Sequence, residues 1–187
     1  MIPEILPTPA VFLLYGAGGD GKSMAAWALA KHISLGLPFE VQNNVVPIKK
    51  GKVLILNADQ PKVQLREQLR EQDYKMDNNT VVIDSLIGSS AGRAFDENKS
   101  SFASPLYRLT NNNGHSFPAT TILVIHHANK QGGFRGTSSI RDAVDETWKL
   151  SKPDKELSEQ LGTNTRIIRV EKSRFSRMGS CLLLKQL

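Results

Sequence analysis

Short apolar runs alternate with segments of helical periodicity along most of this chain. The first run is followed by a glycine-rich turn and then by a strong helix former. Strands are expected over 11–15, 53–56, 81–83 and 122–125, and helices over 22–35, 61–72, 103–112 and 138–144. Because the apolar runs are continuous rather than alternating, they predict strands buried on both faces. The pattern therefore predicts a mostly parallel sheet flanked by helices.

The C-terminal part of the chain follows a different pattern. A short strand is expected over 147–150, and 151–163 is a polar excursion. Apolar runs at 167–170 and 181–184 flank a basic turn, which is typical of an antiparallel hairpin. Between the first helix and the second strand, 37–51 is expected to be a loop. The predicted fold class is α/β, with a mostly parallel central sheet flanked by helices and an antiparallel hairpin at the C-terminus.

The composition is that of a soluble, globular, single-domain chain. It has 187 residues, of which 40% are hydrophobic, and a mean hydropathy of −0.29. No apolar stretch approaches the roughly 18 residues that a membrane span needs. The N-terminus lacks the basic and apolar regions of a secretory signal. The single cysteine, Cys181, excludes an internal disulfide and fits a reducing compartment. A cytoplasmic location without membrane association is expected.

The charge balance adds a weaker indication. The formal net charge is +6 and the sequence pI is about 9.5. A basic balance is compatible with binding to nucleic acid, and equally with an ordinary surface that is rich in lysine. Charge alone therefore does not decide the partner.

The segment between the first predicted strand and helix carries the strongest chemical signal. Residues 16–23 read G-x-x-x-x-G-K-S, a phosphate-binding pattern when it joins a strand to a helix. Glycines let successive backbone N–H groups surround a polyphosphate, and the helix N-terminus adds positive charge. Lys22 is expected to reach the β- and γ-phosphates of ATP, and the Ser23 hydroxyl to bind Mg²⁺. The expected nucleotide-binding residues are Gly16, Ala17, Gly18, Gly19, Asp20, Gly21, Lys22, Ser23 and Met24. The alternative is a merely flexible glycine turn.

Two acidic residues follow predicted strands. Asp84 comes directly after the strand at 81–83, where a P-loop ATPase needs a carboxylate to hold the Mg²⁺ shell, usually through water. Asp59 follows the strand at 53–56, and a carboxylate there can polarise the attacking water. The simpler alternatives are an Asp84 that starts a loop and an Asp59 that starts a turn or a helix before Pro61.

Taken in order, these motifs resemble the RecA-like ATPase domain of ring-forming replicative helicases, in the plasmid RepA-type and phage or plasmid primase-helicase branch. The matching segments are 16–23, 55–61, 81–87, 96–98, 122–130 and 172–179. The resemblance implies a single RecA-like ATPase domain over 1–187, expected to be part of a longer bacterial, phage or plasmid-encoded protein. It also implies ATP and Mg²⁺ as ligands, single-stranded DNA as partner, a hexameric ring in the full-length protein and a fused or partner primase.

The resemblance assigns further roles around the nucleotide. Asp59 stands where the family has its catalytic glutamate. Because aspartate is one methylene shorter, this departure puts the rate of hydrolysis in question. His127 matches the phosphate sensor, with His126 beside it, and an imidazole there can form a hydrogen bond with the γ-phosphate. The alternative is a pair of histidines that only ends a strand.

Two loops resemble those that contact DNA in this family. The second of them, over 131–139, contains Phe134 and Arg135 and is preceded by Lys130. The first, over 88–95, contains Arg93. Loops of this kind line a ring's channel and follow the phosphates of single-stranded DNA. The alternative for both is a mobile loop in solvent. Arg93, Lys130, Phe134 and Arg135 are the expected DNA-binding residues.

Lys172 and Arg174 match the K-x-R pair of the family's terminal hairpin. In the family this pair reaches the nucleotide of the neighbouring subunit, where a guanidinium stabilises charge on the γ-phosphate in trans. A basic surface hairpin whose charges are only solvated is the alternative. The expected catalytic residues are Lys22, Asp59, Asp84, His127, Lys172 and Arg174.

The predicted function is ATP hydrolysis that drives translocation on single-stranded DNA and unwinding of duplex DNA. A RecA/Rad recombinase or a KaiC-like ATPase shares the fold but does not unwind DNA, and the sequence leaves this alternative open. A module in which ATP controls only assembly is also open. A small-molecule kinase would need an acceptor pocket and a lid, and the sequence indicates neither.

Overall fold

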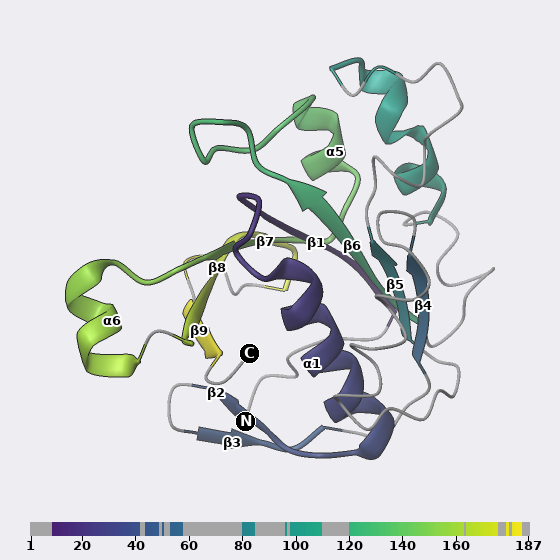
Figure 1. Ribbon diagram of the computed structural model, residues 1–187. Helices are drawn as coiled ribbons and strands as arrows, with labels where there is room; N and C mark the ends of the chain where they lie inside the picture. Colours follow the sequence, from purple (N-terminus) through teal and green to yellow (C-terminus); the bar gives the residue numbers. More distant parts are fainter. Residues whose placement is uncertain are drawn as a thin grey trace.

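In the described part of the chain, seven strands form the central sheet of the computed structural model, in the order β4-β5-β6-β1-β7-β8-β9 (Figure 1). The structure describes residues 9–41, 44–48, 50, 53–57, 80–84, 96, 98–109, 120–162, 164–175, 179 and 181–184. The strands are β1 (Ala10–Gly16), β4 (Val53–Asn57), β5 (Thr80–Asp84), β6 (Thr121–His127), β7 (Glu146–Ser151), β8 (Arg166–Ser173) and β9 (Cys181–Leu184). The strands from β4 to β7 pair in parallel, whereas β8 pairs antiparallel with β7 and β9 antiparallel with β8. The predicted fold class is confirmed.

Helices cover both faces of this sheet. α1 (Lys22–Leu35) packs on one face and ends at Gly36, whose φ of 70° is the left-handed conformation that favours glycine at this position. The opposite face is covered by η1 (Ser100–Ala103), by a helical segment over 104–109 and by α5 (Ser138–Asp142). The helix expected over 22–35 is confirmed. The helix expected over 61–72 lies outside the described residues.

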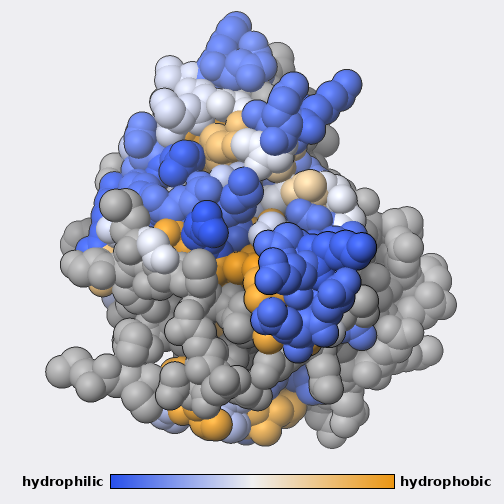
Figure 2. Space-filling model, turned by 90° about the vertical axis from the view of Figure 1, so that its left-hand side faces the viewer, coloured by the Kyte–Doolittle hydropathy of each residue, from blue (hydrophilic) through white to orange (hydrophobic). Residues whose placement is uncertain are grey.

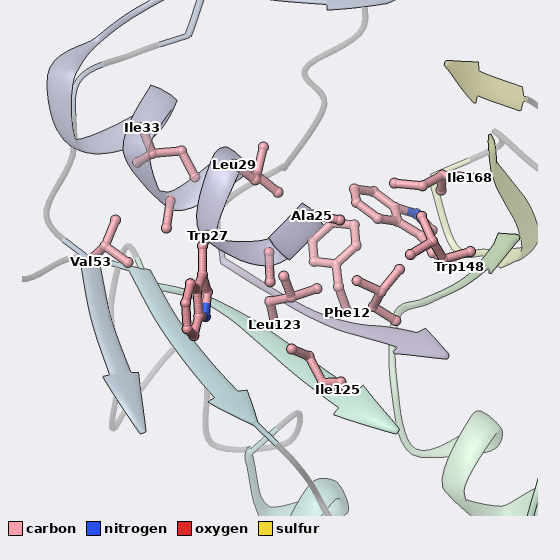
Figure 3. Packing of buried hydrophobic residues seen from close by; sticks show 14 of the residues in the cluster. Phe12, Ala25, Trp27, Leu29, Ile33, Val53, Leu123, Ile125, Trp148 and Ile168 are labelled. Atoms are coloured by element: carbon pink, nitrogen blue, oxygen red, sulfur yellow. The ribbon is translucent and has the colours of Figure 1, made fainter. Parts of the chain in front are cut away.

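The larger buried cluster lies between α1 and the sheet (Figure 3). Trp27 and Ile33 of α1 point toward the strands, and Phe12 of β1 packs edge to face against Trp148 of β7 with ring centroids 5.0 Å apart. Burying side chains of this size stabilises the fold by about 1.5–3 kcal/mol each. This packing fixes the start of α1 against the end of β1, so that the connection between them has a defined position.

A small second sheet departs from the sequence expectation. β2 (Phe39–Val41) and β3 (Asn44–Val46) pair antiparallel within the segment 37–51, which was expected to be a loop. Strands of three residues are too short to produce a recognisable alternation of apolar and polar positions. The sequence pattern therefore gave no signal for this sheet.

The polar excursion at 151–163 contains a helix that the apolar pattern does not reveal. α6 (Lys155–Leu161) buries none of its residues, so it lacks the apolar stripe of a packed helix. Its start is fixed by the Asp154 carboxylate, which accepts a hydrogen bond from the Leu157 N–H at 2.9 Å. The face of the molecule that carries α6 is mostly hydrophilic among the described residues (Figure 2). No helix in the described part of the chain is long and apolar enough to cross a membrane.

Candidate nucleotide-binding site

The glycine-rich connection between β1 and α1, called here the P-loop (residues 16–23), is shaped by two different needs for glycine. At Gly16, a Cβ atom would lie 2.5 Å from the main-chain oxygen of Leu150 in β7, so close packing excludes a side chain. At Gly19 and Gly21, φ is 78° and 88°, which an L-residue with a side chain rarely adopts. A Cβ at Gly18 would meet nothing within 4 Å. The loop therefore packs tightly at its start and is open along its middle.

Side chains of the P-loop hold its own main chain. The buried Lys22 ammonium donates to the main-chain oxygens of Gly16 at 3.1 Å and Ala17 at 2.8 Å. The Asp20 carboxylate accepts from the Ala17 N–H at 3.0 Å. These contacts keep the loop folded around its lysine. Met24, the last expected nucleotide-binding residue, instead packs its side chain against the core on the α1 side of the sheet.

Three strands present their carboxyl ends near this loop. In the register of the sheet, Gly16 at the end of β1 stands opposite His127 at the end of β6, and the Ala128 N–H donates to the Gly16 oxygen at 2.8 Å. Asp84 ends β5, on the other side of β6, and is 3% exposed. His127 is thus placed next to the P-loop, and the Asp84 carboxylate lies at the same edge of the sheet.

The chemistry of these donors fits a nucleotide with a magnesium ion. The Ser23 hydroxyl and the Asp84 carboxylate are the hard oxygen ligands that Mg²⁺ prefers, and Mg²⁺ in nucleotide sites is held by one or two protein groups plus phosphate and water. The Lys22 ammonium and the open middle of the loop suit a polyphosphate. Ser23 and Asp84 are therefore the residues that would hold the ion.

His126 has a different environment from its neighbour. Its ring is fully buried, its Nε2 lies 2.9 Å from the main-chain oxygen of Arg135, and the ring packs against Phe134 with centroids 5.4 Å apart. The two histidines differ because successive side chains of a strand point to opposite faces. His126 anchors the loop that follows β6, whereas His127 is only half-buried beside the P-loop.

The loop after β6 is held together by Asn129. The Asn129 Oδ1 accepts from the N–H groups of Gln131 at 3.0 Å and Gly133 at 2.8 Å, and its main-chain N–H donates to the Gly133 oxygen at 2.8 Å. The loop therefore forms a compact turn. Two of the expected DNA-binding residues here, Lys130 and Arg135, are exposed.

Phe134, the third expected DNA-binding residue of this loop, packs inward. Its ring meets Tyr15 edge to face with centroids 5.3 Å apart, and the Arg141 guanidinium lies 5.8 Å from its centre. Next to it, the Tyr15 hydroxyl donates to Glu171 at 2.6 Å. Burial, followed by this hydrogen bond, raises the pKa of Tyr15 well above its usual range. In this arrangement the Phe134 ring links the loop to β1 and is not presented to a base.

Lys172 and Arg174 are bound within their own chain. The Lys172 ammonium donates to three main-chain oxygens at the end of α5: Arg141 at 2.5 Å, Asp142 at 3.3 Å and Val144 at 2.7 Å. Burial, followed by the nearby charge of Arg174, lowers the pKa of Lys172.

Arg174 makes two intrachain contacts of its own. Its guanidinium pairs with the Asp145 carboxylate at 2.9 Å and donates to the Asp142 oxygen at 3.1 Å. Half of the Arg174 side chain stays exposed. Arg174 is therefore the more accessible member of the expected K-x-R pair.

The register of the sheet separates this pair from the chain's own P-loop. Ser173 pairs with Glu146 of β7, and Glu146 pairs with Phe12 of β1, four positions before Gly16. At about 3.3 Å per residue, this corresponds to about 13 Å along the strand. Lys172 and Arg174 thus lie toward the opposite end of the sheet, and any role at a nucleotide would be at that of another chain.

Two expected site residues lie outside the described part of the structure, and one contact of the P-loop was not predicted from the sequence. Asp59 and Arg93 are not described. Arg166, at the start of β8, donates its Nε to the main-chain oxygen of Asp20 in the P-loop at 2.9 Å. No local pattern signals this contact, because the two residues are 146 positions apart.

The sheet and its flanking helices form a RecA-like fold, and residues 16–23 carry the P-loop pattern between β1 and α1. Residues 1–86 match the family model described as AAA domain. The fold is similar to that of a KaiC-like protein from the hyperthermophilic archaeon Pyrococcus horikoshii, with a TM-score of 0.60 and 12% sequence identity over 94% of this chain and 85% of that one. A search of curated protein sequences gives no match. At this identity the structural likeness concerns the fold alone.

Proposed function

We propose that this chain hydrolyses ATP and that the hydrolysis drives movement along single-stranded DNA, as in the motor domain of a replicative helicase. The observation that carries the ATPase part is the P-loop itself. Packing requires the glycine at Gly16, and backbone conformation favours glycine at Gly19 and Gly21. Lys22 is enclosed by the loop, and His127 stands in register with Gly16. Phosphoryl transfer needs positioning and positive charge around the phosphates, and these residues supply both.

The DNA part of the proposal is supported by the loop after β6. Asn129 gives this loop a fixed shape, and the loop, which directly follows the strand that ends at His127, exposes Lys130 and Arg135. Two exposed cations on a defined turn suit the phosphates of a nucleic acid backbone. Because Phe134 packs inward, recognition would depend on backbone charge rather than on stacking with bases.

Completion of the site by a neighbouring subunit is part of the same proposal. Arg174 lies toward the end of the sheet away from its own P-loop and is half exposed, so a nucleotide that it contacts would be one bound to another chain, with its ion pair to Asp145 exchanged for the phosphate. A guanidinium supplied in trans stabilises the charge that spreads over the γ-phosphate oxygens. Hydrolysis would then require assembly, for which a closed hexameric ring is the expected form.

A second candidate function is an ATPase that uses nucleotide to control its assembly and does not move on DNA. The similarity of the fold to a KaiC-like protein and the inward packing of Phe134 favour it. The two candidates share every feature of the P-loop. They differ in what the loop after β6 contacts.

The rate of phosphate release, measured with and without single-stranded DNA, separates the candidates. A motor should be stimulated by DNA, and replacing both Lys130 and Arg135 by Ala should remove that stimulation while the basal rate remains. Release that is unaffected by DNA would favour the assembly ATPase. A chain that neither binds nor hydrolyses ATP would contradict both.

A further inference from the structure

We propose that Arg166 is a positioning residue of the nucleotide site, which holds the P-loop of its own chain through the main-chain oxygen of Asp20. The inference rests on the proposed binding of ATP and extends it to a residue outside the loop motif. β8 is two strands away from β1 in the sheet, with β7 between them. The Arg166 side chain nevertheless reaches the loop, and its Nε donates to Asp20 at 2.9 Å.

The Arg166 guanidinium is also held by the residue that precedes it. Its Nη1 donates to the main-chain oxygen of Thr165 at 2.8 Å, and the Thr165 hydroxyl donates a hydrogen bond of 2.8 Å to the Leu161 oxygen at the end of α6. Thr165 is buried, with 2% of its surface exposed. The guanidinium therefore bridges two main-chain oxygens, that of Thr165 directly before β8 and that of Asp20 in the P-loop, in the fixed geometry of its planar fork.

The contact with Asp20 determines how the next peptide group is turned. The Asp20 oxygen and the Gly21 N–H belong to one planar peptide unit, and in the trans form they point to opposite sides. A donor that holds the oxygen toward β8 therefore directs the Gly21 N–H away from β8. A phosphate cradle depends on the direction of such N–H groups.

Asp20 is held from the other side as well. Its carboxylate accepts from the Ala17 N–H at 3.0 Å, so the residue is fixed through both its side chain and its main chain. Gly21, which follows, has a φ of 88° and gives no rigidity of its own. Arg166 thus supports the loop next to a glycine whose conformation has no side chain to hold it, and it adds a positive charge on the side of β8.

Arg169 provides a matched control, because it is the same residue type on the same strand but is exposed. Binding of the non-hydrolysable analogue AMP-PNP with Mg²⁺ is measured by calorimetry on the full chain. Arg166→Met is expected to weaken binding about tenfold, and Arg169→Met to change it less than twofold. Arg166→Lys keeps the charge and one donor, so it should recover part of the loss.

Turnover and stability measurements separate positioning from a general loss of structure. Arg166→Met should raise KM for ATP about tenfold and change kcat less than threefold, with a thermal midpoint close to that of Arg169→Met. Should the wild type bind while Arg166→Met binds equally well, or should both methionine variants lose affinity equally, the inference is wrong and the proposed function stands. A wild-type chain that does not bind the analogue overturns the proposed function itself.

Discussion

At the carboxyl end of β1, the hydrogen bonds of Lys22 and the Asp20 carboxylate join residues within the P-loop itself, and Leu150 and Arg166 add contacts from distant strands. Toward the opposite end of the sheet, Lys172 and Arg174 are held by groups about thirty positions away, from Arg141 to Asp145. The structure shows the P-loop in the conformation that its sequence pattern predicts. The role of Lys172 and Arg174 could not be inferred from their spacing alone, because in the fold both cations bind groups of their own chain. A local motif thus identifies chemistry more directly than a pair of charges does.

The largest effect is expected from the removal of Lys22, which tests whether the P-loop binds the phosphates. Lys22→Ala should reduce ATP turnover to background, because the lysine both encloses the loop and supplies the ammonium for the phosphates. Phosphate release and calorimetry measure the effect. Lys31→Ala on the same helix is the control and should behave like the wild type. Turnover retained in Lys22→Ala would refute the assignment of the phosphate site.

Arg174→Ala tests the opposite end of the sheet. If the guanidinium acts in trans, hydrolysis should fall roughly 10³-fold with little change in ATP binding. Mixing Arg174→Ala with Lys22→Ala subunits should restore part of the rate, because an intact P-loop then meets an intact arginine. Arg169→Ala serves as control. If Arg174→Ala leaves the rate of hydrolysis unchanged, Arg174 has no role in trans and serves only in its ion pair with Asp145.

Gly16→Ala and Gly18→Ala sharpen the account of the P-loop. The first places a Cβ 2.5 Å from the Leu150 oxygen and should lower the free energy of unfolding by about 2–3 kcal/mol, whereas the second meets open space. Gly18→Ala should change it by less than about 0.5 kcal/mol. Denaturant unfolding measures both. Equal losses would show that the contact with β7 is not the reason for the first glycine.

The smallest expected effect concerns Lys172. Lys172→Met removes the charged donor from three carbonyl groups at the end of α5 and should lower the free energy of unfolding by about 1 kcal/mol. Arg174→Ala, which breaks a more exposed ion pair, should cost less. The two variants are compared in the same denaturant series. If Arg174→Ala lowers the free energy of unfolding more than Lys172→Met does, Arg174 is the residue that stabilises the end of α5.

Strand positions and the P-loop were predictable because both are encoded by neighbouring residues. Apolar runs marked the described strands of the central sheet except β7, whose sequence ETWKLS is mixed, and the spacing of Gly16, Gly21 and Lys22 marked the loop. α6 was missed because it buries none of its residues, and the sheet of β2 and β3 because its strands are short. Local patterns reveal elements whose burial repeats along the chain.

The contacts of the site were less predictable than its location. The inward packing of Phe134, the anchoring by His126 and the reach of Arg166 to Asp20 all depend on which strands become neighbours. An exposed aromatic and a packed one look alike in a glycine-rich loop. The sequence could name the residues around the nucleotide, but the partners of each side chain required the fold.

β8 connects the two regions compared above, the P-loop and the pair Lys172 and Arg174. Its first residue, Arg166, touches the P-loop of its own chain, and its last residues lead into Arg174 at the other end. In an assembly where Arg174 serves an adjacent chain, two successive ATP sites would be joined by one covalent segment rather than by a series of packing contacts. A shift of the loop at one site would then reach the next along a single hydrogen-bonded strand.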